Sequence, residues 1–599
     1  MTIRRATSAL LLLPLAACGP STQPPTRGAL RCDAPVSALA DVQGGAGRSA
    51  KLGEVVEVQG VVVASWPEGP RGYYLQSPAA TAADAARAVF VAQDAALPTV
   101  GTNLRVRGTL RAIGEPNAAI VAITGGSAAR CGEGPLPAPI ALAQAPADWS
   151  RYEGMRLTLP GPLTVTGNDD LLRQGALDVS FAGRLVHATE RHAPGVEAEA
   201  MAAANAAARV RLDDGRDTEF PDKLWILGKS PLSTRATWRT GSVVRDVTGV
   251  LDLRAGMRRL QLSAPIGAVE QAPREKKPPK VRGEIRIAGF NLLNLFNGDG
   301  AGGGFPTPRG ANEPAELARQ TDKLVGAVAA IAPDAAALME VENDGYGEES
   351  TIAGFVRALN ARLGEERGDY AFVARDAAGV GSDQIGVAMI YRTSTLKPLG
   401  APAVLETGAF ASGNRVPLVQ AFAPVAGGDP FVLVANHLKS KRCGESDAAN
   451  GDHHDGQGCW NALRAQAARE LADWLATDPT AQGAAAQTLV VGDLNSHGEE
   501  DPLRVLRDAG YVDVIARALG DKAYSFVFDG ESGRLDHALA TPALAARIVD
   551  AGEWHVNADE SDAFDYNVEH KGTAERARWY QAGPFRSSDH DPLIVGLKR

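Results

Sequence analysis

The chain has 599 residues, of which 45% are hydrophobic and 22% charged, values typical of a globular protein with several domains. Residues 284–599 carry 28 Lys and Arg against 45 Asp and Glu, a net charge of −17, whereas the remainder carries 33 against 26, a net charge of +7. With a net charge of −17, residues 284–599 do not bind a polyanion by charge alone. Such a charge is typical of a region that concentrates cations or binds metal. The mildly basic half is the better candidate for holding a phosphate backbone.

The first 18 residues have the pattern of an export signal. Arg4 and Arg5 precede the apolar run Ala9–Leu15, which is far shorter than the ~20 residues that a membrane span needs. The LAAC segment at residues 15–18 matches a lipoprotein cleavage box, so we expect lipidation of Cys18. A plain secretory signal cut at another alanine is the alternative. We therefore expect an exported protein that is an outer-membrane or cell-surface lipoprotein, or is extracellular or periplasmic.

Four further cysteines agree with export. Cys32 and Cys131 bracket the first β-rich region, and Cys443 and Cys459 bracket a polar loop. Because oxidising compartments favour disulfides, we expect the pairs Cys32–Cys131 and Cys443–Cys459, although four cysteines allow three pairings. A zinc site is the alternative, but no C-x-x-C spacing supports it.

The N-terminal half predicts two β-rich regions. Residues 53–123 contain short apolar or alternating runs separated by Gly and Pro, and VGTNLRVRGTL resembles the long last strands of an OB-type barrel. Such barrels often bind nucleic acid, and a structural or carbohydrate-facing barrel is an equal alternative. Residues 148–269 form the second region, in which the alanine-rich residues 196–208 are either a helix or a mobile loop. Residues 271–282 are basic and proline-rich, typical of a linker.

From Glu284 onward the pattern changes to alternating buried strands and helices. EIRIAGF, IGVAMIY, FVLVAN and TLVVG are buried strands, and residues 313–331 and 461–475 have helical spacing. This alternation is typical of a layered α/β domain, in which strand ends that converge on one rim form the site. Polar residues lie at six strand ends in this half: Asn291, Glu340, His437, and Asp493 with Asn495 follow apolar runs, Asp536 follows SGRL, and the segment 588–591 precedes the last strand.

The motifs FNLLNLF, LMEVEND, NHLKSK, GDLNS, LDHAL and SDHDP, in this order, resemble the endonuclease/exonuclease/phosphatase superfamily. Large extracellular bacterial endonucleases of that superfamily share the YEGM, DHHDGQGCWN, YSFVFDG and WHVNADE segments. The resemblance covers nearly all of the chain after the signal. It implies an α/β fold, with a four-layer α/β sandwich catalytic domain preceded by β-rich, OB-like barrel domains. The expected divisions are signal 1–18, tether 19–50, barrel 51–145, second β-rich domain 146–270, linker 271–283 and catalytic domain 284–599.

The resemblance implies metal-assisted attack of water on a phosphodiester. A hard divalent cation neutralises the anionic substrate, and carboxylate and amide oxygens suit Mg²⁺, which Ca²⁺ or Mn²⁺ could assist or replace. The resemblance assigns Glu340 as the main metal ligand, completed by Asn291 and Asp589.

The same resemblance assigns the acid–base chemistry to His437 and His590. Asp493 and Asn495 would orient the attacking water and the phosphate. Asp536 would bind at a second metal position or polarise the phosphate. Which of Asp493 and His590 accepts the proton of the water stays open.

Further assignments are based on local alignment. Asp383 is expected to orient His437, and Arg415 is expected to clamp a phosphate. Lys439 and Lys441 either contact phosphate or extend along the surface. We expect structural or solvent-exposed roles for the remaining candidates Glu342, Asp344, His453, His454, His537, His555 and His570, with a structural cation at His453 and His454 as the alternative.

The leading prediction is a secreted metal-dependent phosphodiesterase that cuts DNA internally, with RNA as a further substrate. A phospholipid phosphodiesterase of the sphingomyelin or phosphoinositide type is the main enzymatic alternative, because the same catalytic apparatus serves it. A catalytically inactive surface binding protein is the third reading. The expected partners are nucleic acid as substrate and the membrane through the lipid anchor only, with no obligate protein partner.

Overall fold

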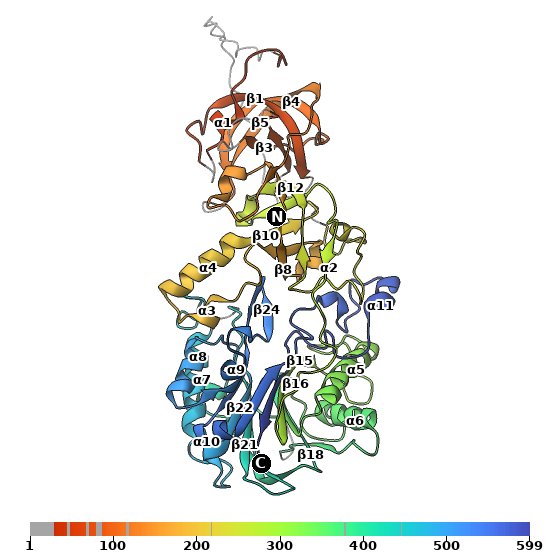
Figure 1. Ribbon diagram of the computed structural model, residues 1–599, viewed down its shortest axis with the longest axis vertical. Coiled ribbons are helices and arrows are strands. Elements are labelled where there is room, and N and C mark those ends of the chain that lie inside the picture. Colours follow the sequence, from red (N-terminus) through yellow and green to blue (C-terminus); the bar gives the residue numbers. More distant parts are fainter. Residues whose placement is uncertain are drawn as a thin grey trace, which may run out of the picture.

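The computed structural model describes residues 29–44, 48–66, 71–78, 87–115, 119–216, 218–375, 379–444 and 446–599. Cys18 and the rest of the signal lie outside these residues, so lipidation stays a prediction. Within the described ranges, no helix has both the length and the apolar character that a membrane crossing requires. Figure 1 shows three parts along the long axis: a β-barrel, a second β-rich region and an α/β domain.

The N-terminal part is a closed five-stranded barrel. Its strands follow the order β1 (Val55–Trp66), β2 (Gly72–Gln76), β3 (Ala88–Ala92), β5 (Ile120–Glu133) and β4 (Thr102–Ile113), preceded by α1 (Leu39–Val42). Val56, Val58 and Val62 of β1 are buried in the barrel core. The strands therefore close a core of their own, and whether this barrel is of the OB type stays a prediction.

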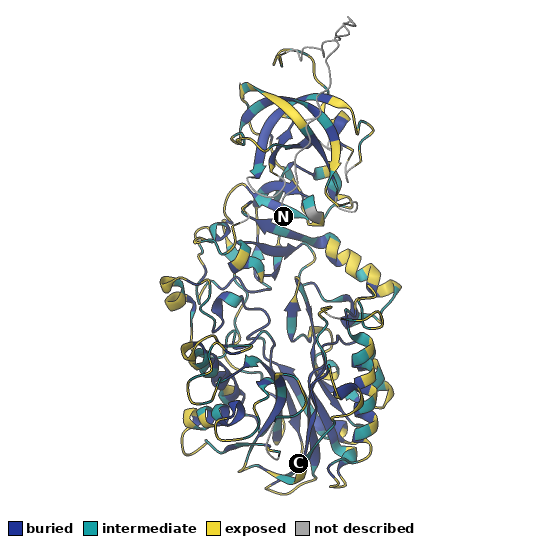
Figure 2. Ribbon diagram, turned by 180° about the vertical axis from the view of Figure 1, so that it is seen from behind, coloured by how far each residue is buried: buried dark blue, intermediate teal, exposed yellow. Residues whose placement is uncertain are grey.

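The second region is a nine-stranded sheet. Its order is β14 (Val269–Glu270), β11 (Val243–Val244), β8 (Leu163–Gly167), β9 (Leu177–Ser180), β10 (Arg209–Asp213), β13 (Arg259–Leu262), β12 (Val247–Asp252), β7 (Arg156–Leu159) and β6 (Ile140–Ala141). The alanine-rich stretch is the helix α4 (Val196–Ala208), and most of it is exposed (Figure 2). The shorter helices are α2 (Asp170–Gln174), α3 (Ala188–Arg191), η1 (Trp149–Tyr152), η2 (Trp225–Leu227) and η3 (Arg254–Gly256).

The C-terminal half contains two six-stranded sheets. The first has the order β17 (Tyr370–Phe372), β18 (Ile385–Arg392), β16 (Ala335–Glu342), β15 (Ile285–Leu295), β28 (Leu593–Leu597) and β27 (Ile548–Glu553). The second has the order β19 (Leu396–Val404), β20 (Leu418–Pro424), β21 (Phe431–His437), β22 (Thr488–Asp493), β26 (Asp536–Ala540) and β23 (Val512–Asp513). β24 (Phe526–Phe528) and β25 (Glu531–Gly533) form a separate hairpin.

Helices cover the outer face of each sheet. Met339 and Val595 of the first sheet share one core with Leu433 and Val491 of the second, so the two sheets pack face to face. The helices α5 (Pro314–Ile331) and α6 (Thr351–Leu363) pack on the first sheet, and α7 (Asn461–Leu475) and α8 (Asp501–Asp508) pack on the second. The predicted four-layer α/β sandwich is therefore confirmed. The remaining helices are α9 (Val514–Leu519), α10 (Pro542–Arg547), α11 (Thr573–Trp579), η4 (Gly408–Phe410), η5 (Ala485–Gln487), η6 (Gly520–Lys522) and η7 (Asp562–Phe564).

Both predicted cysteine pairs are disulfides. Cys32 bonds to Cys131, which joins the segment before α1 to the end of β5. Cys443 bonds to Cys459, which closes the polar loop between β21 and α7. The pairing is confirmed, and the alternative of a zinc site at these cysteines is excluded.

A buried charge cluster joins the second β-rich region to the catalytic domain. The Asp559 carboxylate accepts hydrogen bonds from Arg184 Nη1 at 2.9 Å, from Arg239 Nη2 at 3.0 Å and from the Tyr524 hydroxyl at 2.9 Å. Burial opposes ionisation of this carboxyl, but the two guanidinium groups prevail and lower the pKa of Asp559 to about 2. The contact therefore requires that Asp559 be charged.

The substitution Asp559→Asn is expected to destabilise the protein by about 3–5 kcal/mol, because it removes the ion-pair partner of Arg184 and leaves buried Arg239 paired with Glu560 alone. Since the pKa of Asp559 is lowered, its contribution is present above the usual value of 3.8 and is lost as the pH falls through about 2. The difference from the wild type should therefore shrink between pH 4 and pH 2. Urea denaturation followed by tryptophan fluorescence measures it.

The matched control is Glu219→Gln, which removes an ion pair with Arg173 whose two side chains are each more than half exposed. Exposed pairs contribute about 0–1 kcal/mol, so this variant should behave like the wild type. An equal loss in both variants would show that the Asp559 cluster does not hold the two regions together.

Candidate active site

Five of the predicted site residues gather where strands of both sheets end. Asn291 lies on β15, Glu340 on β16, His437 at the end of β21, Asp493 at the end of β22 and Asp536 at the start of β26. β15 pairs with β16 in parallel, and β21 with β22, so within each sheet these ends lie side by side. The convergence on one rim follows from this topology.

Glu340 lies at an irregularity of β16. The register of β16 against β18 shifts between Met339 and Val341, and Glu340 has a φ of +60°. Such a conformation costs a non-glycine residue about 1–3 kcal/mol, and bulges of this kind change the direction of a side chain. The strand is therefore distorted where the predicted metal ligand leaves it.

Asp493 links the two sheets at the centre of the site. Its Oδ2 accepts a hydrogen bond from Asn291 Nδ2 at 3.2 Å and lies 3.4 Å from His437 Nε2 and 3.9 Å from His590 Nε2. Its Oδ1 accepts from the backbone N–H of Asn495 at 2.8 Å. Burial raises the pKa of Asp493 to about 7, against the opposing charge of His590. This carboxyl can therefore exchange a proton near neutral pH.

Asp536 and His590 form a buried carboxylate–imidazole pair. His590 Nδ1 lies 2.7 Å from Asp536 Oδ2, which also accepts a hydrogen bond from Ser525 Oγ at 2.7 Å. The Phe526 ring packs against the imidazole at 4.6 Å between centroids. Burial favours the neutral ring, but Asp536, Asp589 and other nearby carboxylates raise the pKa of His590 well above its usual value. His590 is therefore an imidazolium at neutral pH.

This pairing adds a role for Asp536 that the sequence did not predict. We expected Asp536 at a second metal position or against the phosphate. Its Oδ2 is engaged by His590 and Ser525, whereas its Oδ1 is buried without a hydrogen-bond partner among the described residues, so that expectation stays a prediction. A carboxylate on Nδ1 fixes the ring orientation and directs Nε2 toward the reacting groups. Asp536 is accordingly a residue that positions His590.

His437 has different surroundings. Its Nε2 lies 3.5 Å from Arg415 Nη1, and its Nδ1 has no hydrogen-bond partner among the described residues. Burial lowers the pKa of His437 well below its usual value, and the charge of Arg415 adds to this effect. His437 is therefore neutral and His590 charged, so the two histidines differ in their protonation state.

The predicted contact between Asp383 and His437 is wrong. Asp383 Oδ2 pairs instead with Arg415 Nε at 3.1 Å, and Asp383 Oδ1 lies 3.7 Å from Arg309 Nη1. Arg415 thus stands between the carboxylate and the imidazole, because a short acidic side chain cannot reach past a guanidinium that is already paired with it. Asp383 influences His437 only through Arg415.

The predicted metal ligands are suitable for a hard divalent cation. Glu340 Oε2 accepts one hydrogen bond, from the backbone N–H of Asn294 at 3.0 Å. Burial and the like charge of Asp589 raise the pKa of Glu340. Two neighbouring carboxylates in a buried site repel each other, and a cation between them relieves this repulsion. Glu340 and Asp589, with the Asn291 amide beside them, offer the oxygen donors that Mg²⁺ prefers.

A polar pocket of about 290 Å³ lies beside Arg415, the neighbour of His437. Asp383, Asn414, Arg415 and Lys439 contribute to its wall, so both predicted phosphate-binding residues face one space. Lys441 does not belong to it, because its ammonium pairs with buried Glu500. Neither of the two predicted roles of Lys441 is therefore observed.

The remaining histidines and acids have mainly structural contacts. His537 bonds to the carbonyl of Ser496 at 2.8 Å, and His570 stacks on Phe220 at 3.7 Å. His555 Nδ1 pairs with Asp591 at 3.0 Å. Solvent exposure was one predicted role of Glu342 and Asp344. Glu342 accepts a hydrogen bond from the backbone N–H of Asn297, and Asp344 accepts one from the backbone N–H of Thr351. His453 and His454 are exposed, as predicted.

Sequence reasoning missed two kinds of residue. Ser525 and Phe526 belong to the YSFVFDG segment, so a signal existed, but nothing in it indicated contact with Asp536 and His590. Arg309 approaches Asp383 from a glycine-rich loop that carries no recognisable pattern. Such contacts depend on packing rather than on local sequence.

The sequence profile described as the Endonuclease/Exonuclease/phosphatase family matches residues 289–590. This span is half of the chain and contains every predicted catalytic and metal-binding residue from Asn291 to His590. The chain therefore belongs to the endonuclease/exonuclease/phosphatase family, and it is a hydrolase of the phosphodiesterase or phosphatase type. Enzymes of this family generally depend on a divalent metal.

No curated protein matches the chain. Among solved structures, the endonuclease/exonuclease/phosphatase from Bacteroides vulgatus is 15% identical over 52% of this chain and 98% of its own, with a TM-score of 0.32. The human Nocturnin catalytic domain with bound sulfate is 14% identical over 52% and 93%, with a TM-score of 0.31. A mannosyl-6-phosphatase from Bacteroides thetaiotaomicron is 15% identical over 52% and 99%, with a TM-score of 0.32.

Proposed function

We propose that the protein is an exported, lipid-anchored, divalent-metal-dependent endonuclease that cleaves DNA and also accepts RNA. The single observation that carries the catalytic part of this proposal is the central position of Asp493, between neutral His437 and charged His590. The N-terminal signal pattern and the two disulfides support export. Mg²⁺ is the proposed cation, with Ca²⁺ or Mn²⁺ able to assist or replace it.

The protonation states suggest how the acid–base work is divided. Asp493, with its pKa near 7, is the proposed general base that accepts the proton of the attacking water. His590 is already protonated and cannot serve as that base, so it donates hydrogen bonds to the phosphate as negative charge develops. A bound divalent cation supplies further neutralisation of the phosphate charge. His437, whose Nε2 lies 3.4 Å from Asp493 Oδ2, and the adjacent Arg415 are proposed to contact the phosphate.

Three features support nucleic acid over lipid as the substrate. Arg415 and Lys439 line a polar pocket, which suits a polyanion with several phosphates. Phe528, 69% exposed, stacks with Phe526, which in turn packs on His590, so an aromatic face is available for a base beside the site. Large exposed apolar side chains among the described residues are scattered along the chain, whereas a lipid-binding surface needs a contiguous patch.

The test is incubation of the purified protein with closed circular plasmid in Mg²⁺ and in chelator. We expect conversion to nicked and then linear DNA only in Mg²⁺, and no conversion by Asp493→Asn in either condition. Cleavage that persists in chelator would contradict metal dependence. Absence of cleavage together with hydrolysis of sphingomyelin would favour the lipid phosphodiesterase, and absence of both would favour a binding protein.

A further inference from the structure

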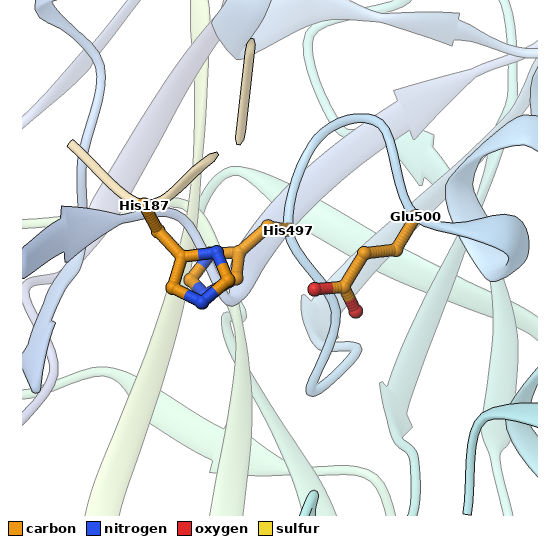
Figure 3. Close-up of side chains that lie close together, drawn as sticks. All are labelled: His187, His497 and Glu500. Carbon is orange, nitrogen blue, oxygen red and sulfur yellow. The ribbon is translucent and has the colours of Figure 1, made fainter. Parts of the chain in front are cut away.

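A second cluster of metal-binding side chains lies outside the proposed active site. His187, His497 and Glu500 place one ligand atom each within 4.8 Å of one another, and Figure 3 shows the three side chains converging. It is the one such group of histidine, cysteine and acidic residues found within the described part of the chain. His187 comes from the second β-rich region, whereas the other two belong to the catalytic domain. The cluster therefore bridges two parts of the protein.

The hydrogen bonds leave one atom of each side chain free to bind a metal. His187 Nδ1 contacts Thr189 Oγ1 at 2.9 Å, and His497 Nδ1 donates to the carbonyl of Arg534 at 3.1 Å. Neither ring has a hydrogen bond at Nε2 among the described residues, and the Glu500 Oε2 atom is buried without a hydrogen-bond partner. A histidine that binds a metal typically gives its other ring N–H to a carbonyl, a carboxylate or water, which fixes the ring. The free Glu500 oxygen is the second, independent sign of a missing ligand, because buried acceptors are almost always satisfied.

The environment keeps the two rings in the form that binds metals. The imidazoles stack at 4.0 Å between centroids with 24° between their planes, so a ring has to turn before both in-plane Nε2 lone pairs point at one ion. Burial lowers the pKa of both, that of His187 to about 3. Lys441 binds the other oxygen of Glu500 and so balances its charge without occupying Oε2. Neutral imidazole is the ligating form of histidine.

We propose that His187, His497 and Glu500 bind a zinc ion that fastens the second β-rich region to the catalytic domain. Two imidazoles and one carboxylate suit Zn²⁺, whereas Mg²⁺ and Ca²⁺ prefer oxygen ligands only. Tetrahedral zinc with bonds of about 2.0–2.1 Å has its ligand atoms about 3.3 Å apart. Binding therefore draws the three atoms together by up to about 1.5 Å, and water completes the coordination.

The position of this site links it to the catalytic loop. His497 follows Asn495 by two residues, and Glu500 is the N-cap residue directly before α8. On the other side, His187 is held to the catalytic domain by its N–H, which donates to the carbonyl of Ser532 at 2.9 Å. Glu190, three residues further, accepts from the N–H of Gly498 at 3.0 Å. Zinc would add a metal bond to this seam and would stiffen the segment from Asp493 to Glu500.

The experiment measures bound metal in the purified full-length protein by mass spectrometry after zinc loading and extensive dialysis. We expect about one zinc ion per chain in the wild type, and less than about a tenth of that in His187→Ala and in Glu500→Gln. Replacement by Co²⁺ should produce the visible absorption bands of a tetrahedral site in the wild type only. The control His192→Ala removes a nearby histidine that pairs with exposed Glu197, and it should retain the zinc.

Two results would overturn the proposal. One is a wild-type protein that keeps no zinc and shows no Co²⁺ spectrum. This result does not depend on whether any variant folds. The other is unchanged zinc in His187→Ala. The variant Glu340→Gln, altered in the proposed active site, should keep its zinc. This result would show that the zinc site is separate from the Mg²⁺ site. The zinc proposal can therefore fail while the proposed function stands, and the reverse.

Discussion

Replacement of His590 by alanine is expected to lower the turnover number for plasmid cleavage by about 10²–10⁴-fold, the range typical for loss of a positioned acid–base group. The imidazolium is held by Asp536 at 2.7 Å and faces Asp493, so its removal takes away a charge at the reacting phosphate. The exposed histidine His454 is the matched control, and His454→Ala should cleave at the wild-type rate. The measurement is the nicking rate in Mg²⁺, with circular dichroism to verify that both variants are folded.

The variant Asp536→Asn tests how His590 acts. Asp536 raises the pKa of His590, so its replacement by asparagine should lower that pKa. A group with a lowered pKa loses its proton at lower pH, so the descending limb of the pH–rate profile should move to lower pH than in the wild type. A purely structural role for Asp536 would reduce activity equally at every pH. Near-normal turnover in His590→Ala would remove the histidine from the mechanism altogether.

The substitution Glu340→Gln is expected to reduce turnover by at least about 10²-fold and to abolish its dependence on Mg²⁺ concentration, because it removes the main carboxylate ligand. The substitution should not lower the stability of the metal-free protein. Burial and Asp589 raise the pKa of Glu340, so ionisation of this carboxyl is unfavourable in the metal-free protein above its usual value of 4.5. In chelator at neutral pH, the variant should therefore melt at the same temperature as the wild type or higher.

Mg²⁺ should then raise the melting temperature of the wild type and not that of Glu340→Gln, because a ligand that binds only the folded state stabilises it. The matched control is Glu342→Gln, two residues along the same strand. Its carboxylate accepts a hydrogen bond from the Asn297 N–H at 2.8 Å and is not expected to bind metal. Loss of the Mg²⁺ response in both variants, or in neither, would contradict the assignment of Glu340 as the ligand.

The charge distribution bears on the catalytic domain and on the barrel in different ways. The net charge of −17 in residues 284–599 agrees with a domain whose site combines several carboxylates with a metal. The barrel at the far end of the molecule, residues 51–145, carries 7 Lys and Arg against 7 Asp and Glu, so the net charge of +7 in residues 1–283 does not by itself select the barrel as the part that holds DNA (Figure 1). Its contribution to binding stays a prediction.

The sequence by itself determined the elements of the catalytic domain and the places where its polar residues emerge. Leu324, Val325, Val328 and Ile331 repeat at helical spacing, and they are buried on α5 as that spacing predicts. Apolar runs that end in Asn291 or Asp493 became buried strands, because a continuous apolar segment is stable only between two layers. These features depend on neighbours a few residues apart. They can therefore be predicted from the local sequence.

The partners of those polar residues were decided by the tertiary structure alone. Asp536 and His590 meet although 54 residues separate them, and the sequence contains no sign that the carboxylate binds the imidazole rather than a metal. Arg415 enters between Asp383 and His437 because the loop before β20 packs there. A hydrogen bond needs its two atoms placed to within a few tenths of an ångström, and only the packing of whole layers sets such distances.

The same reason explains the two contacts between the parts of the chain. Asp559 meets Arg184, and His187 meets His497, across an interface that neither region forms by itself. Each of these side chains is ordinary in its own segment, and its burial and its partner follow from the docking of one folded region on another. Sequence thus determined which groups the chain could offer, and tertiary packing decided which of them share a site.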